Sequence, residues 1–110
     1  MTDEAIRAGF PDPLLEPFQI GKVEFANRIF SSSHAPGYNT DGTPSKRYIA
    51  YHEEKARGGI GLTMIGGSSN VSIDSASLWG QLNFGQDEII DPLIEMTDRI
   101  HSYGTAIMCQ

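Results

Sequence analysis

Apolar residues in the first third of the chain fall into short runs separated by turn-forming residues. Residues 14–25 alternate apolar and polar positions around Gly21 and Lys22, a pattern typical of two short strands joined by a tight turn. Residues 28–33 (RIFSSS) are apolar and then polar, which predicts another short strand. Residues 1–13 include prolines near their end, so we expect a flexible leader without regular helix.

Two segments have helical spacing. In the first, Thr43 is the predicted N-cap, Pro44 takes the first helical position, and Gly58 with Gly59 ends the helix. The second covers residues 87–103 and ends at Gly104; its apolar stripe is made of Ile89, Leu93, Met96, Ile100 and Tyr103.

Two further apolar runs are too short for buried helices. They cover residues 60–65 (IGLTMI) and 105–109, and their length favours parallel strands buried on both faces. Strands alternating with helices predict an α/β fold with crossover connections.

The predicted connections differ in length. The loops that follow strands, 34–43 and 66–86, are long, whereas the links from helix back to strand contain one or two glycines. Long strand-to-helix loops build the active site of a (β/α)8 barrel at the carboxyl ends of its strands. Ligands of open doubly wound sheets bind at the same strand ends, so periodicity alone fits either architecture.

Composition narrows the class of protein. The chain has 110 residues, of which 39% are hydrophobic, and a formal net charge of −6. This suits one domain with a packed core and disfavours binding to nucleic acid or anionic membranes. A single cysteine, Cys109, rules out a disulfide within the chain and a cysteine-based metal site. Without a secretory signal or a run of about 18 apolar residues, we expect a cytoplasmic location and no metal.

Three segments point to a family. They are LLEPFQIGKVEFANRI (14–29), YHEEKARGGIGLTMIGGSS (51–69) and DPLIEMTDRIHSYGTAIMCQ (91–110). In this order and spacing they resemble the N-terminal part of the Old Yellow Enzyme group, the NADH:flavin oxidoreductases. The chain looks closest to the long branch that includes 2,4-dienoyl-CoA reductase, trimethylamine dehydrogenase and N-methylproline-type demethylases.

The resemblance implies the N-terminal fragment of a TIM (β/α)8 barrel with an N-terminal β-hairpin. After the leader at 1–13, residues 14–110 would form a partial FMN-binding barrel with the hairpin, the first three strands and the first two helices. A complete barrel needs roughly 250 residues, so we expect this chain to be truncated.

The resemblance also implies contacts with FMN after the first strand. Ser33 matches a position that contacts the flavin, and His34 and Ala35 match positions that line its ring. Ala35 stands where trimethylamine dehydrogenase has the cysteine that bonds covalently to its flavin. Alanine cannot form that bond, so the FMN is expected to be non-covalent.

The next two strand ends complete the expected contacts. Gly66 and Gly67 match backbone positions against the isoalloxazine, and Gln110 matches a glutamine whose amide bonds the pyrimidine edge. An amide offers a donor and an acceptor to that edge, and glycine lets the backbone approach a flat ring. Taken alone, Gln110 would be a polar strand-end residue and the two glycines a turn.

Other polar residues have simpler interpretations. His34 fits a flavin pocket or a solvated loop equally well, whereas His52 and His101 are expected to be packing or surface residues. We expect Cys109 to point opposite Gln110 and to be a buried, inert thiol. Adjacent Glu53 and Glu54 point in different directions on a helix, which indicates a solvated face rather than a catalytic carboxylate pair.

The expected function follows from the resemblance. The chain would be a fragment of an FMN-dependent NAD(P)H:flavin oxidoreductase that reduces enoates or dienoyl-CoA esters, or demethylates N-methyl amines, with a small-molecule substrate. Catalytic residues, the phosphate-binding loops, an iron–sulfur cluster and an FAD domain would all lie beyond Gln110, so we expect the chain to be inactive alone. A full-length parent could be homo-oligomeric. The alternative is a small non-catalytic binding or interaction module.

Overall fold

The computed structural model describes residue 9 and residues 12–39, 41–75 and 80–110. Most of the leader predicted at 1–13 lies outside these residues. At its end, Asp12 accepts a hydrogen bond from the Leu14 N–H and caps the short 3-10 turn η1 (Pro13–Leu15). No helix among the described residues is long and apolar enough to cross a lipid bilayer.

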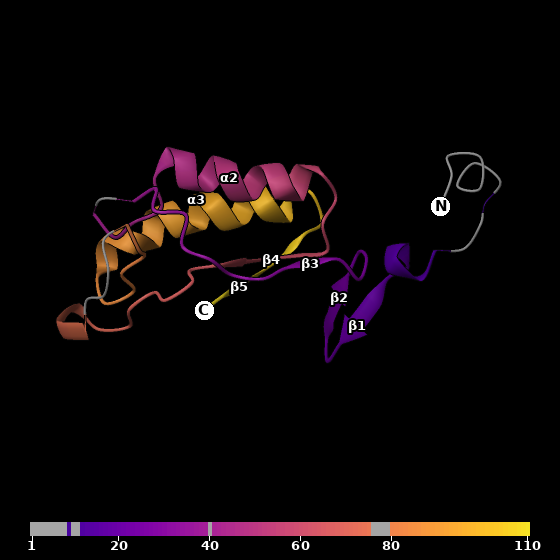
Figure 1. Cartoon of the computed structure of the whole chain (residues 1–110), viewed down its shortest axis with the longest axis horizontal. Helices are drawn as coiled ribbons and strands as arrows, with labels where there is room; N and C mark the ends of the chain where they lie inside the picture. Colours follow the sequence, from indigo (N-terminus) through magenta and orange to yellow (C-terminus); the bar gives the residue numbers. More distant parts are fainter. Residues whose placement is uncertain (1–8, 10–11, 40, 76–79) are drawn as a thin grey trace.

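The predicted hairpin is confirmed. Strands β1 (Phe18–Ile20) and β2 (Val23–Phe25) pair in antiparallel register, with Phe18 opposite Phe25. Gly21 in the turn has a φ of 58°, which glycine adopts without strain. The hairpin lies at one end of the molecule, away from the helices (Figure 1).

The central sheet has three parallel strands, as the alternating pattern predicts. The order is β3 (Phe30–Ser31), β4 (Leu62–Ile65) and β5 (Ala106–Cys109). Ser31 pairs with Thr63, and Thr63 pairs with Ile107. The first of these strands is shorter than the predicted 28–33, because only Phe30 and Ser31 join the ladder.

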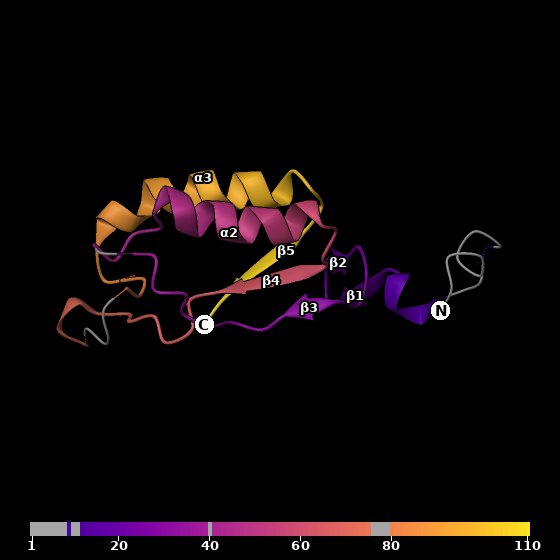
Figure 2. The same ribbon diagram turned by 45° about the horizontal axis from the view of Figure 1, so that its top comes forward.

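Helices α2 (Lys46–Arg57) and α3 (Ile90–His101) lie side by side on one face of the sheet (Figures 1 and 2). A 3-10 turn, η3 (Asp87–Ile89), leads into α3. The long second loop contains the 3-10 turn η2 (Ile73–Ser75) and a parallel bridge between Asn70 and Asn83.

The predicted start of α2 is wrong by two residues. Ser45 is the N-cap, and its Oγ accepts the Tyr48 N–H at 3.1 Å. Both the N–H and the hydroxyl of Thr43 instead donate to Asp41 Oδ1, at 3.0 and 2.9 Å. Pro44 therefore precedes the helix. The predicted end at Gly58 and Gly59 is confirmed, with Gly59 in the left-handed region at a φ of 95°.

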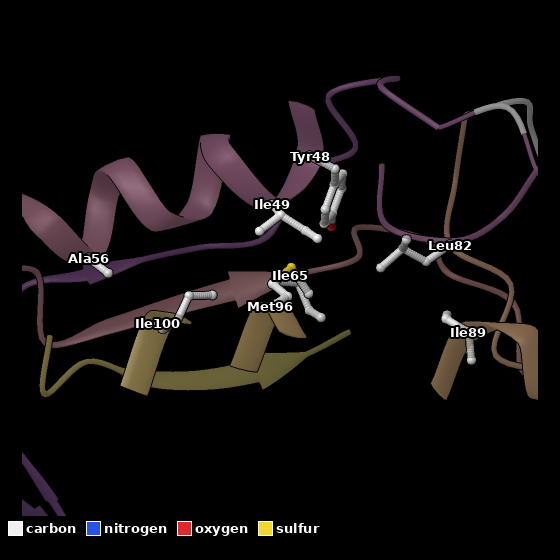
Figure 3. Packing of buried hydrophobic residues seen from close by; sticks show 8 residues of the cluster. All are labelled: Tyr48, Ile49, Ala56, Ile65, Leu82, Ile89, Met96 and Ile100. Carbon is white, nitrogen blue, oxygen red and sulfur yellow. The ribbon is translucent and has the colours of Figure 1, made fainter. Parts of the chain in front are cut away.

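The hydrophobic core fills the space between the two helices and the sheet (Figure 3). It also takes in one side chain from the second loop and one from η3. Its buried members are Tyr48, Ile49, Ala56, Ile65, Leu82, Ile89, Met96 and Ile100. Met64 and Met108 are paired neighbours on the opposite face of the sheet, where Met108 is 50% exposed.

Three residues with polar or reactive side chains have contrasting environments. His52 is fully buried, with Nδ1 2.8 Å from Thr63 Oγ1, and burial lowers its pKa to about 4, helped by the charges of Lys55 and His34. His101 is exposed. The prediction that Cys109 is buried is wrong: β5 is an edge strand, so its last residues lack cover on one side. Partial desolvation still raises the pKa of the thiol.

Candidate functional site

The carboxyl ends of the three parallel strands meet at one edge of the sheet, and all six predicted site residues lie there. Gln110 follows β5, and its backbone N–H donates to the Ile65 carbonyl at 3.0 Å. The hydroxyl of Ser33, beyond the end of β3, donates to Oε1 of Gln110. This contact joins residues 77 positions apart in the sequence. The contact with Ser33 uses the amide oxygen of Gln110 and does not involve the amide NH2 group, which is a hydrogen-bond donor.

Gly66 and Gly67 occupy the middle of this edge, directly after β4. Both are in the left-handed region, with φ values of 95° and 75°. A Cβ on Gly66 would overlap the carbonyl oxygen of Gln110, and one on Gly67 would lie 2.7 Å from the Ala35 nitrogen and from the His34 Cα. The glycines are thus required by backbone conformation and by close approach of both neighbouring strand ends.

A buried tyrosine supports the same turn. Tyr48, in the first turn of α2, is 1% exposed, and its hydroxyl oxygen accepts the Gly66 N–H at 2.9 Å. Burial raises the pKa of Tyr48 to about 12, against the lowering effect of the Gly66 hydrogen bond. The phenol therefore keeps its proton at physiological pH. The sequence shows Tyr48 only as a core position of the helix, so pattern reasoning missed this contact.

His34 is held against α2. Its Nε2 lies 2.6 Å from the Tyr51 hydroxyl, and the two rings meet edge to face. Lys55 Nζ lies 4.5 Å from the centre of the Tyr51 ring and donates to Ser31 Oγ at 2.8 Å. His34 is exposed, but its imidazole is fixed by this contact rather than free in the loop.

A separate hollow among the described residues lies along α2. It has a volume of about 600 Å³ and is lined by Tyr38, Arg47, Ala50, Tyr51, Glu54 and Lys55. Arg47 already stacks on Tyr38, with its guanidinium carbon 4.1 Å from the ring centre. We place the candidate site at the strand ends, because the segments that follow three different strands contact one another there.

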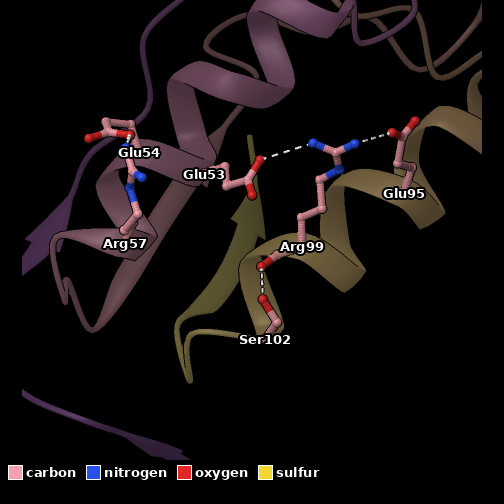
Figure 4. Close-up of polar contacts among 6 residues, drawn as sticks. All are labelled: Glu53, Glu54, Arg57, Glu95, Arg99 and Ser102. Atoms are coloured by element: carbon pink, nitrogen blue, oxygen red, sulfur yellow. Dashed lines mark hydrogen bonds and ion pairs between the residues drawn. The ribbon is translucent and has the colours of Figure 1, made fainter.

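Glu53 and Glu54 bind different arginines and do not form a catalytic pair (Figure 4). Glu53 pairs with Arg99 at 3.2 Å, and Glu54 pairs with Arg57 at 2.6 Å. Arg99 also pairs with Glu95 of its own helix at 2.8 Å, so the contact that links α2 to α3 on the surface is the one with Glu53. These contacts agree with the solvated face expected from the sequence.

The chemistry of the strand-end edge suits a flat ligand with a polar rim. It offers a side-chain amide at Gln110, a hydroxyl at Ser33 that orients this amide, and a turn at Gly66 and Gly67 without side chains. Glycine backbone can lie against a ring face, and an amide can serve its carbonyl or N–H groups. The fold thus defines an α/β protein, and its candidate ligand site lies at the carboxyl ends of parallel strands.

Comparison with known proteins identifies the family. Residues 13–110 match the NADH:flavin oxidoreductase / NADH oxidase family, and the chain belongs to it. This confirms the resemblance to the N-terminal part of the Old Yellow Enzyme group. The family implies FMN as cofactor and NAD(P)H as reductant.

Individual relatives agree with this assignment. The chain is 48% identical over 99 residues to the "Multifunctional alkene reductase/demethylase OYE" of Caballeronia cordobensis, and 46% identical over 99 residues to the "Probable N-methylproline demethylase" of Rhizobium meliloti (strain 1021); each match covers 90% of this chain. The chain spans 15% of the length of each of these relatives.

A solved structure shares the fold. The Old Yellow Enzyme from Pichia sp. AKU4542 superposes with a TM-score of 0.81 at 19% identity, covering 89% of this chain and 25% of that one. The arrangement of three parallel strands and two helices is therefore also present in that solved structure.

Proposed function

We propose that this chain supplies one side of the FMN site in the (β/α)8 barrel of an FMN-dependent oxidoreductase. The observation that carries the proposal is the convergence of Ser33, Gly66, Gly67 and Gln110 at the carboxyl ends of three adjacent parallel strands. We call the full-length protein to which the chain would belong the parent protein. β3 and β5 have open edges in the described sheet, which suits a sheet that continues on both sides into a barrel.

The residues present fit FMN. Gln110 would bond the pyrimidine edge of the flavin with its amide, while Ser33 fixes the orientation of that amide. The turn at Gly66 and Gly67 would lie against the ring without a side chain in between. Bound FMN supplies the hydride chemistry, with NAD(P)H as the reductant. His34 and Ala35 would line the site where their backbone packs against Gly67.

Ala35 makes the proposed attachment non-covalent, because a methyl side chain has no group that could bond to the flavin. Denaturing the purified parent protein with acid should then release all of the yellow cofactor into solution. Flavin that stays with the precipitated protein would contradict this point.

We further propose that the parent protein acts on a small molecule, either reducing an activated alkene or demethylating an N-methyl amine. The names of the two relatives described above support these reaction types. An iron–sulfur cluster and an FAD domain would lie outside residues 1–110, and homo-oligomerisation would be a property of the parent protein.

The direct test is FMN binding by the parent protein and by a Gln110→Leu variant. Losing one hydrogen bond to the ligand should raise the FMN dissociation constant about tenfold. Gln19→Leu is the matched control, because Gln19 bonds the Gly21 carbonyl in the exposed hairpin at 3.1 Å and should leave affinity unchanged. A parent protein that binds no FMN would refute the proposal, and an unchanged affinity in Gln110→Leu would remove this residue from the site.

The isolated chain should not bind FMN, since we expect the phosphate-binding loops of the family to lie outside residues 1–110. Its exposed apolar side chains also count against a self-sufficient binding module; they include Leu14, Leu15, Phe18, Ile20, Val23 and Met108. Purified alone, the 110-residue chain should aggregate or melt without cooperativity. A monomeric, cooperatively folding chain would favour the module instead.

A further inference from the structure

Three strand ends carry the proposed flavin contacts, and their relative positions depend on the turn in the middle. Gly66 lies so close to the Gln110 carbonyl that a Cβ would overlap it, and a Cβ on Gly67 would meet the backbone of His34 and Ala35. Any displacement of this turn therefore moves it relative to both neighbours. The contact that fixes this turn therefore also sets the spacing of the three strand ends.

The glycines cannot fix it by themselves. Glycine has the widest choice of backbone conformations of any residue, and Gly66, Gly67 and Ser68 are consecutive residues with positive φ. Such a segment needs an external contact to hold one conformation. The Gly66 N–H is buried, and its hydrogen-bond acceptor is the hydroxyl of Tyr48 at 2.9 Å.

Tyr48 is itself closely packed. It is 1% exposed, its ring packs against His52 with 5.0 Å between ring centres, and it belongs to the core cluster between the helices and the sheet. Its backbone N–H bonds the Ser45 cap at the start of α2. The Tyr48 side chain thus connects the first turn of α2 to the end of β4 from within the packed core.

We propose that Tyr48 is a positioning residue of the flavin site, which holds the Gly66–Gly67 turn in the conformation that meets FMN by accepting the Gly66 N–H. The inference rests on the proposed FMN function. Tyr48 acts through the turn, since its hydroxyl lies in the core and touches Gly66. Because its pKa is raised to about 12, the phenol is neutral at working pH and acts by hydrogen bonding rather than by charge.

The test compares Tyr48→Phe with Thr63→Val in the FMN-loaded parent protein. Tyr48→Phe keeps the ring in the core and removes only the hydroxyl, leaving the Gly66 N–H buried without a partner. Thr63→Val removes a comparable buried hydrogen bond, 2.8 Å long, between the same helix and the same strand. Thr63 lies three residues before Gly66, and its hydroxyl bonds His52 rather than the turn.

Three quantities distinguish a positioning role from a purely structural one: the FMN dissociation constant, the visible circular dichroism of bound flavin, and hydrogen exchange of the peptide containing Gly66. Tyr48→Phe should raise the dissociation constant about tenfold, change the flavin spectrum and accelerate exchange at Gly66. Thr63→Val should lower the melting temperature by a similar amount, yet change the dissociation constant less than about twofold and keep the wild-type flavin spectrum.

Two outcomes would overturn the inference while leaving the proposed function intact: a Tyr48→Phe protein with wild-type affinity and flavin spectrum, or a Thr63→Val protein with the same flavin defects at equal loss of stability. A wild-type parent protein that takes up no FMN would instead refute the proposed function, and the inference with it. Accelerated exchange at Gly66 without any flavin defect would count against the inference as well.

Discussion

Replacing Gly66 with alanine should destabilise the protein more than the same change at Gly59. The two glycines have the same φ of 95°, so alanine at either position meets the same backbone strain of about 1–2 kcal/mol. They differ in their surroundings. A Cβ on Gly59 meets nothing within 4 Å, whereas one on Gly66 overlaps the Gln110 carbonyl and approaches Ser69 Oγ to 2.6 Å.

The difference in unfolding free energy between the two variants measures the effect of the close approach of Gln110, which follows β5, to the turn. Forcing an extra carbon into a packed position typically costs about 1–3 kcal/mol. We therefore expect Gly59→Ala to lower the free energy of unfolding by about 1–2 kcal/mol and Gly66→Ala by about 2–5 kcal/mol. Urea unfolding of the parent protein measures both changes in free energy. The midpoints are compared on the condition that the dependence of the free energy on urea concentration stays the same.

The same pair of variants also separates stability from ligand binding. Gly66→Ala should lose FMN because the Gln110 backbone must move away, whereas Gly59→Ala lies at the other end of β4 and should retain it. Equal destabilisation by the two substitutions would show that Gln110 does not pack on Gly66, and the described geometry of the strand-end edge would then be wrong.

Three further expectations concern the supporting structure. Burial lowers the pKa of His52 to about 4, below its ordinary value, so unfolding takes up a proton, and the free energy of unfolding should fall by up to about 3 kcal/mol as pH drops from about 6.5 to 4. His52→Gln should make the urea midpoint depend less on pH over this range. An unchanged dependence of the midpoint on pH would contradict the assignment. Ser45→Ala should cost about 1 kcal/mol by loss of the N-cap, and Thr43→Ala clearly less; the reverse order in thermal melts would restore Thr43 as the cap. Arg99→Ala should shift the melting temperature only slightly at low salt and not at all at high salt, because its ion pairs are exposed; a large shift at high salt would refute this.

The elements of the fold follow from local patterns, but one boundary depends on contacts across a loop. Thr43 and Ser45 are both good cap residues, and the Pro44 between them suits either choice. The structure selects Ser45 because its N–H bonds Asn39 Oδ1 at 2.9 Å and its hydroxyl donates to the Tyr38 carbonyl at 2.8 Å. Neither contact can be read from the helix itself.

Whether residues at the edge of the sheet are buried or exposed also could not be predicted from the sequence. Strict alternation assigns Cys109 and Gln110 to opposite faces of β5, but exposure depends on whether another strand lies alongside. Periodicity does not give the order of strands in the sheet, and β5 lies at its edge. An apolar residue at the end of an edge strand is exposed even where the pattern marks it as core.

The site residues can be predicted from resemblance to the family, but not from physical pattern. Ser33 and Gln110 are 77 positions apart, and Tyr48 and Gly66 are 18 apart. The first contact exists only once the three strands have assembled, and the second only once α2 has packed on the sheet. Glycine pairs and strand-end glutamines are too common in proteins to indicate a flavin site by themselves. Resemblance to the family therefore indicates which residues belong to the proposed site, and the structure shows the contacts between them.

Those contacts explain why the core and the proposed site are coupled at one point. The hairpin lies at one end of the molecule (Figure 1), and the ion pairs of Arg99 are exposed on the helices, so we expect changes there to alter stability without affecting the site. Ile65, by contrast, packs in the core and accepts the Gln110 N–H, and the next residue, Gly66, donates to Tyr48. The geometry that would meet a flat ligand is therefore set within two consecutive residues at the end of β4, where one backbone carbonyl holds β5 and one backbone N–H holds α2.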